Sequence, residues 1–146
     1  MRILPHVMTT IEEALEGSTP LAEKVRAAGP DHSTDDVIAR MRAILPTLTD
    51  SEKVATLNAH PRIGENPGRL SARSLQEQGN EALPELHRLN AEYERRFGFR
   101  FVVFVNRRPK AEIVEELRRR LRRSREEELE DGLRAIVDIA EDRLRG

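Results

Sequence analysis

The sequence predicts an all-α protein: a single-domain helical bundle of about seven to eight helices, with one short extended segment near residues 99–105. Two observations favour this fold. Apolar residues recur at helical spacing in most segments that lie between turn-forming residues, and several of those segments begin at a Ser or Thr that can cap a helix. Only residues 97–105 are rich in strand-forming side chains, and the chain offers no second strand to pair with them.

The predicted helices of the N-terminal half are bounded by caps and stops. Their predicted N-caps are Thr9 or Thr10, Ser18, Ser33 and Thr49. The first three helices are expected to end at Gly17, Gly29 and Pro46. The fourth begins with a capping box, because Glu52 follows Thr49 by three residues, and it runs directly into His60.

In the C-terminal half, Ser71 opens a helix that Gly79-Asn80 interrupts, and Pro84 starts another that reaches Gly98. A further helix runs from Lys110 to about Arg123, with apolar positions inward at Ile113, Leu117 and Leu121. The charged stretch after it could continue as one helix. We predict a break at Ser124 instead, because Ser124 and Glu127 have the spacing of a capping box.

Composition limits the kind of function. The 146 residues suffice for one domain, residues 1–146, and the net charge of -1 gives no general attraction to nucleic acid or membrane. The longest apolar run, residues 101–105, is far shorter than the ~20 residues of a membrane span, and the N-terminus has no signal-peptide pattern. The absence of cysteine is compatible with a reducing compartment. We expect a cytoplasmic protein.

The candidate active site begins at His60-Pro61. Proline disfavours helical geometry in the residue before it, so a titratable imidazole stands at the start of a stiff loop. Ser74, Glu77 and Gln78 share one face of the next predicted helix. They offer a hydroxyl, a carboxylate and an amide, which suit a small polar ligand with amide edges. A solvent-exposed face is the alternative.

Two further patterns concern charge. Six of the eight residues from 118 to 125 are arginine, which predicts a polyanion site, a solvated ion-paired face, or one arginine that clamps a substrate carboxylate. Arg120, next to Leu121, is our candidate for that clamp. No two histidines have metal-ligand spacing, so we expect no metal site.

Five segments together resemble the 2-oxo-4-hydroxy-4-carboxy-5-ureidoimidazoline (OHCU) decarboxylases, enzymes of the uricase route from urate to S-allantoin. They stand in the family's order and spacing: residues 16–20 (E-x-S-P), 57–64 (HP-x-[LI]), 74–78 (S-x-x-E-Q), 89–101 (LN-x-x-Y-x-x-x-FG-x-x-F) and 120–144. The resemblance implies an all-α fold, no cofactor, a homodimer, and a carboxylated ureidoimidazoline as substrate.

The resemblance also implies residue roles. His60 would be the acid/base and Glu77 its partner and substrate anchor. The remaining substrate-binding positions would be Pro61, Ser74, Gln78, Phe101, Val102, Val103 and Arg120. The sequence departs from the family pattern at Thr19, Gly79-Asn80, Arg100 and Arg123, which leaves the substrate fit open. The competing hypothesis is a non-catalytic helical paralogue that binds a small ureide or an acidic partner.

Overall fold

The structure is a computed structural model that describes residues 9–29, 33–63 and 84–146. These residues form seven α-helices and the short 3-10 helix η2 (Leu45–Thr47), with no β-strand among them. The helices are α1 (Ile11–Ala14), α2 (Pro20–Ala27), α3 (Thr34–Ile44), α4 (Asp50–Asn58), α6 (Pro84–Phe97), α7 (Lys110–Arg120) and α8 (Arg125–Arg145). The all-α prediction is therefore confirmed. No helix in the described ranges is long and apolar enough to cross a membrane.

Most of the predicted caps are present. Thr10, Thr49 and Ser124 each form a full capping box, and Ser33 accepts a hydrogen bond from the Asp36 amide. The prediction of Ser18 was wrong, because the cap of α2 is Thr19, whose hydroxyl accepts from the Ala22 amide at 3.1 Å. Pro20 explains the shift. It occupies the first helical position, where its missing N–H costs nothing, so the residue before it becomes the cap.

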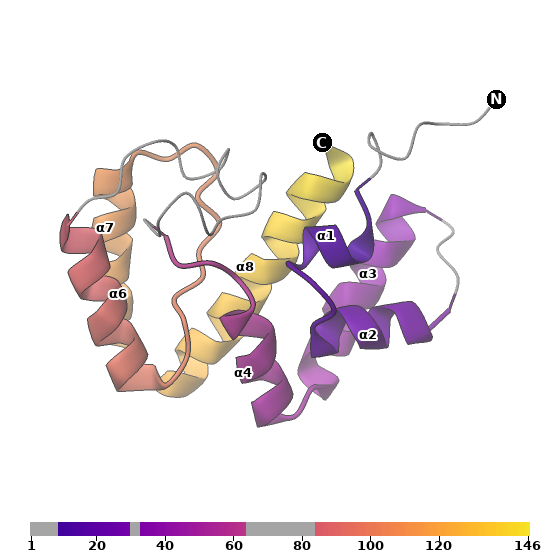
Figure 1. Cartoon of the computed structure of the whole chain (residues 1–146), viewed down its shortest axis with the longest axis horizontal. Helices are drawn as coiled ribbons and strands as arrows, with labels where there is room; N and C mark the ends of the chain where they lie inside the picture. Colours follow the sequence, from indigo (N-terminus) through magenta and orange to yellow (C-terminus); the bar gives the residue numbers. More distant parts are fainter. Residues whose placement is uncertain (1–8, 30–32, 64–83) are drawn as a thin grey trace.

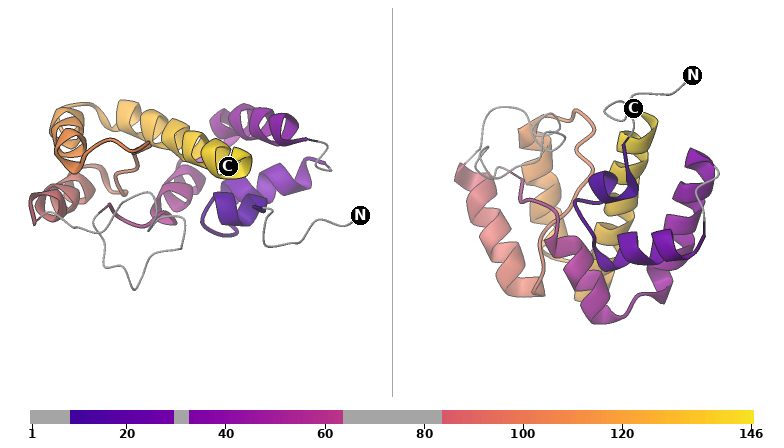
Figure 2. Two further views of the ribbon diagram at one scale, coloured as in Figure 1. Left: turned by 90° about the horizontal axis from the view of Figure 1, so that it is seen from above. Right: turned by 45° about the vertical axis from the view of Figure 1, so that its right-hand side comes forward.

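Helix α8 is the central element of the fold. It packs against α1, α3 and α4, whereas α6 and α7 pair with each other at the far end of the molecule (Figures 1 and 2). Helix α4 approaches α8 closely at Gly132, where an added β-carbon would lie 2.9 Å from Cδ2 of Leu57. This crossing links the helix that leads to His60 with the helix that forms the spine of the bundle.

The predicted extended segment is present at residues 100–105, and Phe101, Val102 and Val103 are buried in it. Tyr93 of α6 packs its ring against Phe101 with the centroids 5.2 Å apart. Arginine side chains satisfy carbonyl groups that a neighbouring strand would otherwise bind. Nη1 of Arg120 donates to the Val102 carbonyl, and Arg108 donates to the carbonyls of residues 104 and 105.

At the corner between α7 and α8, the structure agrees with the predicted break but differs from the sequence interpretation in which residue is buried. Helix α7 ends at Arg120 and α8 starts after Ser124, so the predicted break is confirmed. Arg120, however, is buried, whereas Leu121 is only partly so. The position of Arg120 follows from its ion pair, since its Nε lies 2.7 Å from Oε1 of the fully buried Glu128.

Candidate active site

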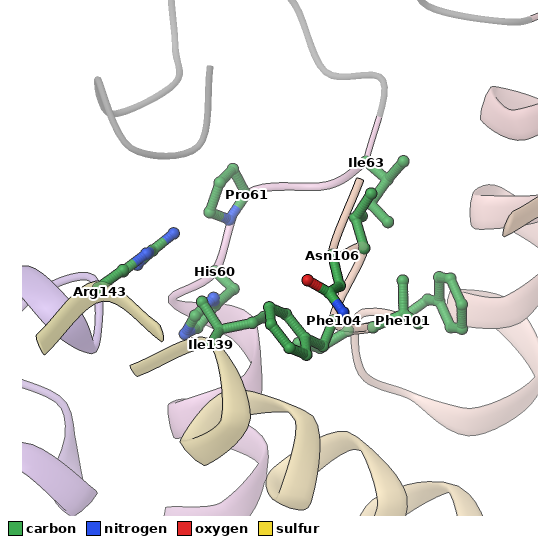
Figure 3. A pocket seen from close by; sticks show the side chains of 11 residues that line it. His60, Pro61, Ile63, Phe101, Phe104, Asn106, Ile139 and Arg143 are labelled. Carbon is green, nitrogen blue, oxygen red and sulfur yellow. The ribbon is translucent and has the colours of Figure 1, made fainter. Parts of the chain in front are cut away.

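A pocket opens where the end of α4, the extended segment and the C-terminal part of α8 meet. Its lining is His60, Pro61, Ile63, residues 101–106, Ile139 and Arg143. His60, Pro61 and Arg143 lie on the same side of the pocket, and Ile139 comes from the preceding turn of α8 (Figure 3). Of the predicted site residues, His60, Pro61, Phe101, Val102 and Val103 therefore share one cavity.

The backbone around His60 is held on both sides. The His60 amide donates to the Leu57 carbonyl at 3.2 Å, which tightens the last turn of α4. Nη1 of Arg100 donates to the His60 carbonyl at 2.9 Å, and the Arg100 amide donates to Oδ1 of Asn58 at 2.9 Å. Arg100 departs from the family sequence pattern, yet here it fixes the extended segment against the loop that carries the imidazole.

His60 is neutral at physiological pH. Only 4% of its surface is exposed, and burial, followed by the positive charge of Arg143, lowers the pKa of His60 from 6.5 to about 3. Its Nε2 has no hydrogen-bond partner among the described residues. A buried imidazole with an unpaired ring nitrogen can give or take one hydrogen bond from a ligand in the pocket.

Arg143 supplies the positive charge of the pocket. Its side chain is 1% exposed, and its Nη1 donates to the Ala14 carbonyl at 3.1 Å. Sequence reasoning missed this role, although a signal exists. Arg143 continues the apolar stripe of α8 seven residues after Ile136, so a charged side chain stands where the helical period predicts a buried one.

Arg120, our predicted carboxylate clamp, is not among the residues that line this pocket. Besides Glu128, its guanidinium has Glu116 at 3.4 Å, and it lies 4.8 Å from the centre of the Phe101 ring. Arg120 therefore supports the extended segment from outside this pocket.

Three predicted residues, Ser74, Glu77 and Gln78, lie outside the described residues, as does the departure at Gly79-Asn80. The pairing of Glu77 with His60 stays a prediction. The other departures have structural partners: Thr19 caps α2, and Arg123 makes ion pairs with Glu128 and Asp131 at 3.0 and 2.8 Å.

Comparison with known proteins identifies the family. The model of the OHCU decarboxylase family matches residues 5–145. The chain belongs to the OHCU decarboxylase family. A crystal structure of an OHCU decarboxylase in the presence of (S)-allantoin superposes with a TM-score of 0.68 at 27% identity, covering 87% of this chain and 89% of that one.

The curated relatives are of two kinds, OHCU decarboxylases and uric acid degradation bifunctional proteins. The decarboxylase of Haloferax volcanii is 31% identical and the mouse decarboxylase 30%, and the chain covers 83% and 76% of their lengths. The uric acid degradation bifunctional protein PucL of Bacillus subtilis is 32% identical over 92% of this chain. The chain spans only 29% of PucL and 27% of the corresponding Bacillus sp. protein.

Proposed function

We propose that the protein decarboxylates OHCU to S-allantoin without a cofactor. The observation that carries this proposal is the neutral, buried His60, with an unpaired Nε2, beside Arg143 in one pocket. The family fold and the names of the relatives support the same reaction. Residues 1–146 would form one domain of this enzyme.

OHCU carries a hydroxyl and a carboxyl on the same ring carbon. The reaction that the site must support follows from this arrangement. When carbon dioxide leaves, its electron pair moves toward the ring double bond, whose nitrogen takes a proton from solvent. His60 then accepts the hydroxyl proton as a carbonyl forms, and returns that proton to the neighbouring carbon on one face. A histidine that is neutral before the reaction is in the correct state for the first transfer.

The remaining groups would hold the substrate. Arg143 would bind the carboxylate with parallel hydrogen bonds and keep the reacting carbon against His60. The backbone of residues 101–103 and the ring of Pro61 would contact the ureido and ring edges. We keep Glu77 as the predicted partner of His60, with Ser74 and Gln78 shaping the pocket, and we assign Arg120 to support of the extended segment.

The test follows chiral allantoin by circular dichroism after addition of the protein to freshly generated substrate. The wild-type chain should accelerate formation of the S enantiomer, whereas His60→Asn should lose on the order of 100-fold or more, the usual share of a general acid/base. Arg143→Met should raise KM strongly. His87→Asn, at an exposed histidine of α6, is the matched control and should keep wild-type rates.

Two outcomes would refute the proposal: no acceleration by the wild-type chain, or wild-type rates from a folded His60→Asn variant. The first outcome, with a ureide still bound, would favour the non-catalytic paralogue. We also propose that the protein is a cytoplasmic homodimer, as the family resemblance implies. Light scattering after size-exclusion chromatography checks the dimer, and fractionation of cells checks the compartment.

A further inference from the structure

Glu16 lies two residues after the end of α1, in a backbone conformation that is unusual for its residue type. Its φ is +64°, in the left-handed region, and Gly17 follows with a φ of +124°. A side chain with a β-carbon is disfavoured there, and such residues persist where the surrounding structure requires them. The Gly17 amide donates to the Glu12 carbonyl at 2.7 Å, so the chain turns sharply at Glu16.

The turn brings Glu16 to Arg143, which comes from the other end of the chain. Oε1 of Glu16 lies 3.0 Å from Nη1 of Arg143, the same nitrogen that donates to the Ala14 carbonyl. Both side chains are largely shielded from water, with 12% and 1% exposed. A guanidinium is planar, so two acceptors on one of its nitrogens fix the plane of the whole group.

From this geometry we infer that Glu16 is a positioning residue of the active site, which orients the Arg143 guanidinium toward a carboxylate held beside His60. The inference rests on the proposed function. The carboxylate of Glu16 also compensates the buried charge of Arg143 before substrate arrives. Ala14 at the end of α1, through its carbonyl, and Glu16 in the following turn, through its side chain, thus orient the anion-binding group of the pocket.

The alternative is that the ion pair only ties the turn after α1 to α8. Variants at Glu16 separate the two roles. Glu16→Gln keeps an oxygen that can accept from Nη1, whereas Glu16→Ala removes it. If Glu16 positions Arg143, kcat/KM should fall on the order of 10- to 100-fold in Glu16→Ala, mainly through KM, and by only a few-fold in Glu16→Gln.

Glu12 provides the matched control. It is a glutamate of α1, close to Glu16 in sequence, that pairs with Arg26 at 2.6 Å, and it does not line the pocket. Glu12→Ala should leave kcat and KM unchanged. Equal kinetics for folded Glu16→Ala and wild type, or equal losses for Glu16→Ala and Glu12→Ala, would overturn the inference.

Chemical rescue gives a readout that does not depend on turnover. Millimolar guanidinium should bind Arg143→Ala, in the space left between Glu16 and the Ala14 carbonyl, and shift the His60 imidazole resonances in NMR spectra. The Glu16→Ala/Arg143→Ala double variant should bind it about 10-fold more weakly, in line with the loss of one charge-assisted hydrogen bond. If guanidinium binds both variants equally, or binds neither, Glu16 does not hold the guanidinium group.

The two experiments also separate this inference from the proposed function. If the wild-type chain forms no allantoin, the decarboxylase proposal fails, while guanidinium binding still tests whether Glu16 holds the guanidinium. If the wild-type chain is active and the Glu16 variants match it, the enzyme stands and the positioning role falls.

Discussion

At the residue scale, the charge of His60 is set by its surroundings. An ordinary histidine titrates near pH 6.5, but burial and Arg143 lower the pKa of His60 to about 3. The folded chain therefore excludes a proton that the unfolded chain accepts. This difference links the protonation state of the imidazole to the stability of the whole fold.

The linkage predicts how stability depends on pH. Below about pH 6.5 the unfolded imidazole takes up a proton that the folded one binds only near pH 3. The contribution of His60 is thus fully present above pH 6.5 and is lost as the pH falls toward 3. The shift from 6.5 to about 3 corresponds to a loss on the order of 5 kcal/mol at 1.4 kcal/mol per unit.

Urea unfolding at a series of pH values measures this effect. Carboxylates with a lowered pKa also contribute stability that the protein loses in acid. Glu12, which accepts a hydrogen bond from Arg26, is one of them. The difference between wild type and His60→Gln removes that common part. Stability of His60→Gln should fall less steeply between pH 6.5 and 4 than that of wild type or of His87→Gln. Parallel curves for all three proteins would contradict a buried neutral His60.

The sequence predicted these residues unevenly, for a physical reason. His60-Pro61 stands out because proline restricts its neighbour, which is a local effect. Arg143 meets Ala14 and Glu16 only after the chain has folded, so neither contact has a local signature. Arg120 was assigned to the substrate by resemblance, while its burial depends on Glu128, eight residues away across a turn.

At the scale of elements, the α7–α8 corner supports the extended segment through buried charge. Glu128 accepts hydrogen bonds from Arg120 and from the Tyr93 hydroxyl, both at 2.7 Å. Burial, together with the carboxylate of Glu128, raises the pKa of Tyr93, so the phenol keeps its proton and remains a donor. Arg120 in turn donates to the Val102 carbonyl, which lies in the pocket wall.

Removal of Glu128 should therefore be costly. Glu128→Ala leaves Arg120 buried without its closest counter-charge, which typically costs about 3–5 kcal/mol of unfolding free energy. Glu130→Ala on the same helix is the control, because the Glu130 side chain is 73% exposed and its pair with Arg134 is worth at most about 1 kcal/mol. Urea denaturation compares the two, and a similar small loss in both would show that the corner does not depend on Glu128.

The helix boundaries show which features local sequence patterns can predict. The capping boxes at Thr49 and Ser124 were predicted correctly, because each consists of two side chains, three residues apart, that accept hydrogen bonds from each other's backbone amides. The break at Ser124 followed even though charge alone allowed one long helix. The support of the extended segment by Arg120 could not be predicted, because its guanidinium and the Val102 carbonyl are 18 residues apart and meet only in the tertiary structure.

At the scale of the whole molecule, ion pairs with carboxylates neutralise much of the positive charge of the arginines. Within the arginine-rich stretch 118–125, Arg118 pairs with Glu85 and Glu115, and Arg125 pairs with Asp50. Arg120 is buried and Arg123 has two carboxylate neighbours. With a net charge of -1, this pattern favours an ion-paired surface over a polyanion site.

A heparin column tests the remaining polyanion hypothesis. We expect the protein to pass through at about 0.15 M salt, because few arginines of this stretch lack a carboxylate neighbour and surface pairs already satisfy their charges. Retention that weakens steeply with added salt would instead indicate several released counter-ions and a genuine polyanion surface.

The close packing of Gly132 against Leu57 helps to set the geometry of the site. Helix α4 delivers the imidazole and α8 delivers the guanidinium, so the separation of these two groups depends on how closely the helices cross. A side chain at residue 132 would meet Cδ2 of Leu57, so either the Leu57 side chain or α4 would have to shift. A substitution at residue 132, which does not line the pocket, would therefore act on the distance between the imidazole and the guanidinium through the packing of the two helices.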